Sequence, residues 1–496
     1  MAELARVLEA RSRDRATISQ RLVSTYFDTP QGGLREAGIV LRVRAQQGRF
    51  VQTVKIAERD EANLFARGEW EDVVAENRPD PAAPESGSRI PAELVGALSQ
   101  VFVSDVERMA IEIEPRPGTR VEAAVDRGWI RTADSVRSEP ISEIELELKE
   151  GDPAALYDLA LELLETASLR IDLCSKAERG YRLVESAAEP PATAAPEPLA
   201  LAPEMTLEDA LQHLGRGCLA HLLRSEPAAL AGTIEGVHQM RVATRRLRSM
   251  LSAVKEMLPA AERRWVSDEI KALTAGLSAA RNLDVFATEL LPPAREQSPD
   301  QPGWGALSNA VESARANAHR RVREEIRSPR HTASLLRLLR WFEGRGWRAP
   351  GGEPDPALQQ TIGALAPELL DRRREQVRQR SRHFRRLPAH QRHRLRIAVK
   401  KLRYTIELLG SIYNEPDLHP FVKRLKRVQD ELGYANDVRV AYSLVIELGR
   451  TTTEFESLAE ASAQLLALHQ QKLAQREDKL RCRLWRLNEA RPFWRA

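Results

Sequence analysis

The stretch VHQMRVATRRLRSML (237–251) is written again 155 residues later as RHRLRIAVKKLRYTI (392–406). An α-helix turns about 100° per residue, so residues separated by 0, 3, 7 and 10 positions lie within roughly 80° of one another. Four positions with this spacing are basic in both copies. We therefore predict two amphipathic helices with one cationic stripe each, formed by His238, Arg241, Arg245 and Arg248 in the first copy and by His393, Arg396, Lys400 and Arg403 in the second.

The opposite side of each predicted helix is apolar, as at Met240 and Leu247 in the first copy and at Leu395 and Leu402 in the second. A solvated Lys/Arg face is the commonest fate of charge on a helix. Like charges four residues apart nevertheless repel by a few tenths of a kcal/mol per pair. This chain keeps that repulsion twice, with a histidine at the same end each time. The duplication therefore favours a polyanionic ligand that offsets the repulsion.

The formal net charge of +4 conceals two electrostatically different halves. Residues 1–190 carry 25 Lys+Arg and 35 Asp+Glu, a net charge of −10, which leaves +14 for the rest of the chain. The 3 cysteines are far apart and fit neither a disulfide framework nor a zinc site, so we expect a reducing cytoplasm. No stretch approaches the ~18 uncharged apolar residues of a membrane span, and the N-terminus lacks the apolar segment of a signal peptide. We expect no membrane partner.

The chain is expected to be an α+β protein with two domains. Alternation with period 2, broken by turn residues, predicts strands in a first domain over residues 1–185. The Pro/Ala-rich segment 186–205 is typical of a stiff linker. From residue 206 to 496 the pattern is helical, and its interruptions separate two repeats at about 206–340 and 357–496. We predict an all-α pair of duplicated helical bundles there.

Charged side chains gather on one face of the predicted strands, because alternate residues of a strand point the same way. Arg42 and Arg44 share a face, and Glu143, Glu145 and Glu147 form a row of three carboxylates. An ordinary sheet with its polar face in water is the default explanation. Strands that carry both signs suggest instead a polar barrel interior, where carboxylates hold Mg²⁺ or Mn²⁺ and basic groups neutralise phosphate oxygens. Such a site suits phosphoryl transfer to water.

Seven short motifs run in order through the first domain: TYFDT (25–29), LRVR (41–44), TVK (53–55), RGEWE (67–71), VDRG (125–128), EIELEL (143–148) and SKAERGYRL (175–183). Together they resemble the CYTH domain of the triphosphate tunnel metalloenzymes. The resemblance implies an eight-stranded antiparallel β-barrel tunnel that binds triphosphate. It further implies phosphate contacts from Arg42, Arg44, Lys55, Arg67, Arg108 and Lys176. Glu143, Glu145 and Glu147 would be metal ligands or support them.

One departure from that family concerns the first strand of the tunnel. The family normally opens with a strand carrying E-x-E-x-K, whose glutamates bind metal and whose lysine contacts phosphate. This chain opens with MAELARVLEARS (1–12), which reads as the helix that follows such a strand. We expect the strand either to lie upstream of Met1 or to be lost together with two ligands. Metal-dependent hydrolysis of triphosphate depends on which of these holds.

The second domain carries a further repeated pair, GLSAARNLDV (276–285) and QDELGYANDV (429–438), in which Leu277 aligns with Leu432 at the same offset of 155 residues. With the two basic stripes, this pair resembles the CHAD domain over residues 206–496. The resemblance implies binding of inorganic polyphosphate, with one basic groove per bundle facing a linear chain. Bacterial CYTH proteins with this second domain are typically inorganic triphosphatases, and adenylate cyclases and thiamine triphosphatases are relatives.

The residue types in the two stripes also favour a phosphate polymer on physical grounds. A flexible polyanion is bound through counterion release and charge-assisted hydrogen bonds, which need many Arg and Lys side chains. Single-stranded nucleic acid favours aromatic stacking platforms, and the stripes have little beyond Tyr404 and Phe384, so nucleic acid is the least favoured partner. We predict a cytoplasmic polyphosphate-binding protein, associated with polyphosphate granules, with a tunnel domain of the inorganic triphosphatase type. The alternative is a non-catalytic polyphosphate-binding protein with a degenerate tunnel.

Overall fold

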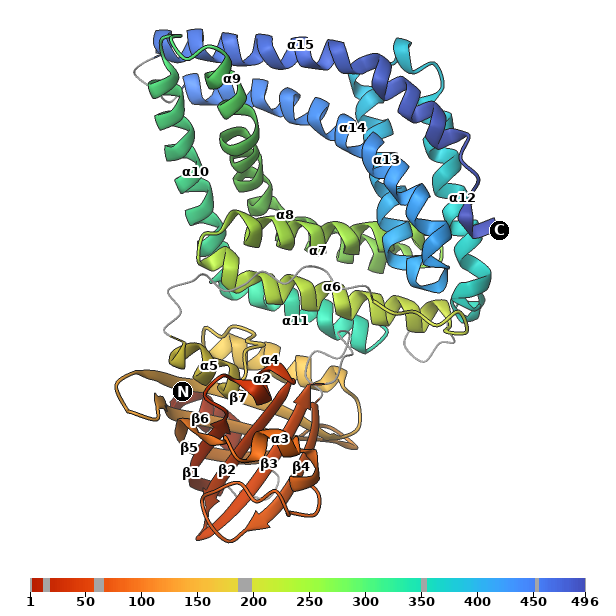
Figure 1. Cartoon of the computed structure of the whole chain (residues 1–496). Helices are drawn as coiled ribbons and strands as arrows, with labels where there is room; N and C mark the ends of the chain where they lie inside the picture. The colour runs from red at the N-terminus through yellow and green to blue at the C-terminus, as the bar shows by residue number, and fades with distance from the viewer. Residues whose placement is uncertain are drawn as a thin grey trace. The chain divides into compact units, whose positions relative to one another are not determined.

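A computed structural model describes residues 2–11, 18–57, 67–185, 199–348, 355–450 and 455–495 of the chain. The chain divides into two compact units (Figure 1). The first contains Met1–Pro190 and Thr332–Gly344, and the second contains Pro191–His331 and Arg345–Ala496. Most of the predicted linker, 186–198, lies outside the described residues. Among the described helices, none is both long and apolar enough to cross a membrane.

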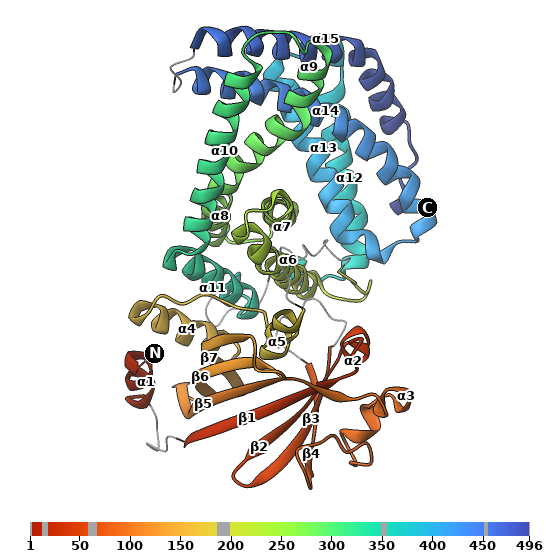
Figure 2. The same ribbon diagram turned by 60° about the vertical axis from the view of Figure 1, so that its left-hand side comes forward.

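The first unit is built on an antiparallel sheet of seven strands in the order β4-β3-β2-β1-β5-β6-β7 (Figures 1 and 2). The strands are β1 (Ile18–Asp28), β2 (Ile39–Gln46), β3 (Arg49–Ala57), β4 (Arg67–Val74), β5 (Ser99–Arg116), β6 (Thr119–Thr132) and β7 (Ser138–Glu150). Its helices are α1 (Ala2–Glu9), α2 (Gly33–Glu36), α3 (Ala92–Val95), α4 (Ala154–Thr166) and α5 (Lys176–Val184), together with most of α11 (Pro329–Glu343).

The sheet is not closed into a barrel, so the expectation of a closed eight-stranded tunnel is wrong for the described residues. Their strands leave β4 and β7 as the two edges. The first described residues form α1 rather than a closing strand, because Leu4 and Leu8 have the i,i+4 spacing of a helix. Both leucines are buried against Ile111 and Leu159, on the apolar face of the sheet that α4 also covers.

The second unit is helical throughout its described residues (Figure 1). Its helices are α6 (Leu207–Leu230), α7 (Ile234–Ala253), α8 (Ala260–Val285), a π-helical turn η2 (Phe286–Leu290), α9 (Leu291–Gln297), α10 (Trp304–Ile326), α12 (Ile362–Ser381), α13 (Ala389–Leu409), α14 (Glu415–Gly449) and α15 (Phe455–Asn488). Short 3-10 turns, η1 (Gly87–Arg89) in the first unit and η3 (Pro356–Gln359), η4 (Phe384–Arg386), η5 (Gly410–Ile412) and η6 (Phe493–Arg495) in the second, complete the elements.

The duplicated helices are α7 and α13, and their apolar sides are buried as predicted. The buried residues are Met240, Ala243, Leu247, Met250, Leu251 and Val254 in α7, and Leu395, Ala398, Leu402, Thr405, Ile406 and Leu409 in α13. α7 packs on α6 and α13 packs on α12, which repeats one helix pair in each half. α7 and α13 also pack on each other, so the two repeats share one compact unit rather than forming separate bundles.

Candidate functional sites

Strand register places the predicted site residues of the first unit on one face of the sheet. Arg42 and Thr53 are cross-strand partners, and Lys55 lies two residues from Thr53, which places it on the same face. At the other end of the sheet Arg108 pairs with Asp126, and Asp126 pairs with Glu143. On this face the cations Arg42, Arg44, Lys55 and Arg108 lie on β2, β3 and β5. Carboxylates lie on both sides of them, Glu69 and Glu71 on β4 and Asp126, Glu143, Glu145 and Glu147 on β6 and β7.

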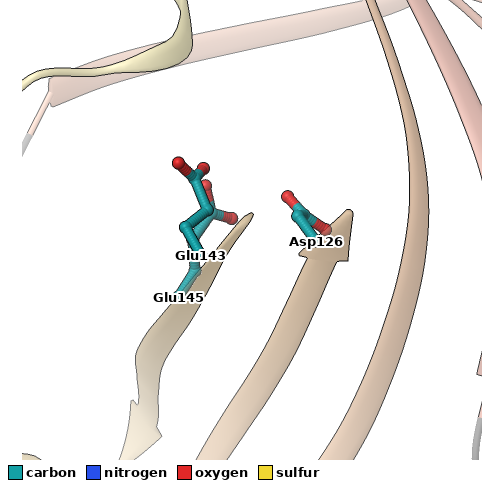
Figure 3. Close-up of side chains that lie close together, drawn as sticks. All are labelled: Asp126, Glu143 and Glu145. Carbon is teal, nitrogen blue, oxygen red and sulfur yellow. The ribbon is translucent and has the colours of Figure 1, made fainter. Parts of the chain in front are cut away.

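Three carboxylates form one cluster on this face. Asp126, Glu143 and Glu145 can each direct an oxygen so that the three atoms lie within 4.8 Å of one another (Figure 3). Asp126 is fully buried, whereas Glu145 is half exposed. The structure thus brings together two of the three predicted carboxylates. Glu147 lies further along β7 and pairs with Lys149 at 2.8 Å, and Asp126 takes the third place.

Two cations reach into the carboxylate cluster. Lys176 is the first residue of α5, which Ser175 caps through a reciprocal capping box with Glu178. The Nζ atom of Lys176 lies 2.8 Å from Asp126 and 2.6 Å from Glu145, and it also contacts Glu143. Arg108 donates two parallel hydrogen bonds to Asp126, at 2.8 and 2.7 Å, and a third to Glu145.

Glu145 is held ionised by these two cations. Burial by itself would raise the pKa of Glu145, but Lys176 and Arg108 together outweigh it and lower that pKa to about 2. Burial would likewise lower the pKa of Lys176, and the carboxylates of Glu145, Asp126 and Glu143 raise it instead. Glu145 and Lys176 are therefore both charged at neutral pH, and the oxygen atoms of Glu145 are available as ligands without the loss of a proton.

The cationic part of the face is less well balanced. Arg42 lies 3.3 Å from Glu69, yet its Nε atom is buried without a hydrogen-bond partner. Burial and the neighbouring charge of Arg42 lower the pKa of Arg44 to about 10. Lys55 pairs with Glu69 at 2.8 Å. Arg67 begins β4 on the same face, but its side chain lies outside the described part of the structure.

The donor set fits a hard divalent cation. Three carboxylates supply only oxygen ligands, which Mg²⁺ and Mn²⁺ prefer, and a magnesium ion keeps several waters when one or two carboxylates hold it. A metal ion in this cluster would meet the ammonium group of Lys176, so Lys176 must turn away when the ion binds. Its flexible stem, at the first turn of α5, permits that movement.

In the second unit the two predicted stripes face each other across the contact between α7 and α13. Arg241 and Arg245 of α7 lie close enough to Arg396 and Lys400 of α13 for their charges to act on one another. The guanidinium of Arg245 also lies over the ring of Tyr404, 5.5 Å from its centroid. The predicted pair of grooves, one per bundle, is therefore replaced by one shared centre, which we call the central basic site.

Several cationic groups of the central basic site have no acceptor. Arg241 Nη1, Arg245 Nε and Arg396 Nε are buried and make no hydrogen bond within the described residues. No ion pair joins these three arginines or Lys400 to a described carboxylate. A buried, unpaired donor costs about 1–3 kcal/mol, and more when it is charged. These donors therefore point to an anionic ligand whose oxygens would complete the site.

The proton affinities of the central basic site reflect the same imbalance. Burial first, and then Arg396 and Arg245, lower the pKa of Lys400 to about 7. Burial, Arg245 and Arg281 lower the pKa of Arg241 to about 10. An anion among these groups would favour their charged forms and reverse both shifts.

The remaining members of the two stripes lie beside the central basic site or further from it. His238 and His393 adjoin the central basic site, where burial and the neighbouring arginines lower the pKa of each imidazole. Arg248 is exposed at the C-terminal end of α7. Arg403 pairs with Glu407 at 2.6 Å and belongs to a local helix contact.

Three charged residues beside the stripes were not among the residues predicted from the sequence. Arg281 of α8 and Arg439 and Asp437 of α14 adjoin the stripes, as their effects on Arg241, His393 and Lys400 show. All three lie in or beside the repeated segments 276–285 and 429–438. That duplication was the signal that could have assigned them to the site.

Comparison with known proteins assigns the two halves separately. Residues 3–181 match the CYTH domain, and residues 213–445 match the CHAD domain. The crystal structure of the CHAD domain from the plant Ricinus communis is similar to the helical part, with a TM-score of 0.53 and 27% identity over 60% of this chain and 98% of that chain.

Two curated relatives are similar over part of their length. An inorganic triphosphatase of Haemophilus influenzae is 29% identical over 164 residues, which are 33% of this chain and 46% of that protein. An uncharacterized protein of Mycobacterium tuberculosis is 26% identical over 193 residues, 38% of this chain and 37% of that protein. The chain thus spans less than half the length of these relatives.

Proposed function

Because the chain carries a CYTH domain followed by a CHAD domain, we propose that it binds inorganic polyphosphate and that its first domain is a metal-dependent triphosphatase. The similar inorganic triphosphatase of Haemophilus influenzae supports the choice of triphosphate as substrate. We further propose that the protein acts in the cytoplasm and associates there with polyphosphate granules.

The convergence of the two stripes is the observation that carries polyphosphate binding. Arg241, Arg245, Arg396 and Lys400 lie together without paired carboxylates, and three of them keep buried donors without acceptors. A linear phosphate polymer offers charged oxygens along its whole length, so one molecule can satisfy donors from both repeats. Tyr404 lies beneath Arg245 rather than open to a base, and the site has no row of stacking rings for nucleic acid.

Titration of the full chain with long-chain polyphosphate tests this half of the proposal. The double variant Arg241→Gln with Arg245→Gln removes two charge-assisted contacts worth about 1.5–3 kcal/mol each. We expect the dissociation constant to rise at least about 100-fold. Arg320→Gln with Arg321→Gln, two exposed positions of α10, is the control with the same loss of charge. Equal losses in both variants would show that net charge alone binds the polymer.

The cations and carboxylates on one face of the sheet support triphosphate hydrolysis. Arg42, Arg44, Lys55 and Arg108 would neutralise phosphate oxygens. Asp126, Glu143 and Glu145 would hold Mg²⁺ or Mn²⁺, which polarises the phosphoryl group and stabilises the leaving phosphate when bound. Lys176 lies against these carboxylates and, once released from them, would contact a phosphate oxygen.

Release of phosphate from triphosphate, with and without Mg²⁺ or Mn²⁺, tests the hydrolase half. The test uses the chain extended by an N-terminal strand that carries E-x-E-x-K. Glu145→Gln keeps the shape of the side chain but removes its ligand charge, so metal-dependent release by the extended chain should fall at least about 100-fold. Arg320→Gln is again the control. Activity that survives Glu145→Gln would show that the metal lies elsewhere.

A second candidate function is non-catalytic binding of polyphosphate. The open sheet favours it, because β4 and β7 remain as edges and the described residues supply no closing strand. The ion pairs from Lys176 and Arg108 to all three carboxylates favour it too, since these cations compete with a metal. Tight polyphosphate binding without metal-dependent phosphate release would select this function.

A further inference from the structure

A second group of cations lies beside the central basic site, on the side of α13 that faces α12. We call it the flanking basic cluster. Its members are Arg248 and Lys255 at the C-terminal end of α7, Arg372, Arg373 and Arg380 of α12, and Lys401 of α13.

Contacts between the three helices hold this cluster together. Arg373 donates to the hydroxyl of Ser252 on α7 at 3.1 Å, and Arg372 reaches Glu256 just beyond α7 at 3.1 Å. Arg380 donates to the backbone carbonyl of Arg394 on α13 at 3.1 Å. The cluster therefore lies where α12 meets both duplicated helices.

The centre of the cluster is buried and forms no ion pair with a described carboxylate. Arg373 is only 5% exposed, and its other hydrogen bond goes to the neutral amide of Gln376 at 3.5 Å. Burial, and then Arg373, Arg380, Lys255 and Arg248, lower the pKa of Lys401. A merely solvated Lys/Arg face keeps its charges in water, and Arg373 does not fit that explanation.

The flanking basic cluster also contains far more cations than carboxylates. Six cations share one carboxylate, that of Glu256, which pairs with Lys255 at 3.7 Å and with Arg372 at 3.1 Å. The other four cations form no ion pair with any described carboxylate. The cluster thus presents a large uncompensated positive charge, as the central basic site does.

The two groups are adjacent along the same helices. Lys400 belongs to the central basic site and Lys401 to the flanking cluster, so the two side chains leave α13 about 100° apart. On α7, Arg245 and Arg248 are three residues apart and lie on neighbouring parts of one face. The two basic groups are therefore adjacent on both duplicated helices.

We propose that the flanking basic cluster is a second anion-binding site and that one linear condensed-phosphate chain spans it and the central basic site. This inference rests on the proposed polyphosphate binding and deepens it, because it makes affinity depend on chain length. A chain of a few phosphates occupies the central basic site alone. A long chain continues around α13 to Arg248, Lys255 and Arg380.

The test compares short-chain and long-chain polyphosphate on the full chain. Arg42→Gln and Arg44→Gln are present throughout, to suppress phosphate binding by the sheet. The test variant adds Arg248→Gln, Lys255→Gln and Arg380→Gln, all exposed side chains, and leaves the buried Arg373 in place. The control variant adds Arg320→Gln, Arg321→Gln and Arg327→Gln, three exposed residues of α10 or its C-cap.

We expect the test variant to bind short chains as the control does and to bind long chains about tenfold more weakly. The slope of log affinity against log salt for long chains should become shallower by about 2, at about 0.7 per lost contact as for single-stranded nucleic acid. Long-chain affinity and slope equal to those of the control would overturn the proposal, and so would equal losses for short and long chains. If the parent chain binds neither polymer, the proposed function itself fails.

Discussion

The charged face of the sheet and the central basic site differ in how they balance charge. On the sheet, Asp126 is buried between Arg108 and Lys176, so acids and bases satisfy one another. Between α7 and α13, Arg241 meets other cations, and Arg396 has Asp437 nearby as well as Arg245 and Arg439. The buried donors of both arginines have no hydrogen-bond acceptor within the described residues. The sheet is thus close to neutral where its charges are densest, and the helical site is not.

This difference indicates two kinds of ligand. A site that balances its own charges must exchange partners when a metal and a phosphate enter, because Lys176 and Arg108 already fill the carboxylates. A site of unpaired cations needs no exchange and is completed by a polyanion. The same difference predicts opposite responses to mutation in the two units.

The largest expected effect distinguishes the two sides of α7. Leu247 is fully buried, so Leu247→Asp places an unpaired carboxylate in the core and should unfold the second unit, at a cost of about 4 kcal/mol or more. Arg241→Glu with Arg245→Glu should abolish polyphosphate binding and leave the helical content unchanged. Circular dichroism measures the helical content of both variants, and titration with polyphosphate measures binding by the double variant. Loss of helix in the double variant would show that the stripe is part of the core.

Removal of one arginine from each site should have opposite effects on stability. Arg108→Met leaves Asp126 buried with only Lys176 as partner, so the free energy of unfolding of the first unit should fall by about 3 kcal/mol. Arg241→Met relieves repulsion from Arg245 and Arg396 and should be neutral or stabilise the second unit by about 1 kcal/mol.

Urea unfolding followed separately in each unit checks this pair of variants. Arg108→Met combined with Asp126→Asn should recover most of the lost stability, because no buried charge then lacks a partner. A destabilised Arg241→Met variant would mean that hidden acceptors already satisfy the central basic site.

The next effect concerns catalysis by the open sheet. We expect residues 1–496 to release phosphate from triphosphate slowly or not at all. An added N-terminal strand bearing E-x-E-x-K, paired between β4 and β7, should raise metal-dependent release by at least about 100-fold, which is about 2.7 kcal/mol. A strand with Q-x-Q-x-K is the matched control. Equal rates for the two added strands would show that the strand does not contribute metal ligands.

The smallest predicted effect is a proton linked to polyphosphate binding. Lys400, with its pKa lowered to about 7, is mostly neutral in the free protein above pH 7, and a bound anion favours its charged form. Binding should therefore take up about one proton at pH 8. Affinity should fall by up to tenfold per pH unit as the pH rises from 7 towards the usual lysine pKa of about 10.4.

Calorimetric titration in two buffers with different ionisation enthalpies measures this proton uptake. Lys400→Arg should keep the binding and lose most of the uptake, because arginine stays protonated. An unchanged uptake in Lys400→Arg would assign the proton to another group, such as His238.

Much of each site could be predicted from residue spacing. Period 2 put Arg42, Arg44 and the glutamates of β7 on one face, and the 155-residue repeat predicted both stripes and both buried sides. These features depend on local geometry, which the order of residues determines directly.

The parts that could not be predicted depend on contacts between distant segments. Asp126 was visible within VDRG, but its place beside Glu143 follows from the register between β6 and β7. No pattern in the sequence indicated that α7 and α13 pack on each other. Because they do, one shared site replaces the two predicted grooves. Arg373 and Lys401, two cations, come close together only because α12 packs on α13.

We propose that polyphosphate binds to the unpaired cations between α7 and α13 and not to the charged face of the sheet. The most direct test titrates long-chain polyphosphate into two variants of the full chain, Arg241→Gln with Arg245→Gln and Arg42→Gln with Arg44→Gln, each at two salt concentrations. We predict that the helical variant loses at least about 100-fold in affinity and has a shallower salt dependence, while the sheet variant binds as the unmodified chain does. Strong, salt-dependent binding by the helical variant, with binding lost in the sheet variant, would contradict it.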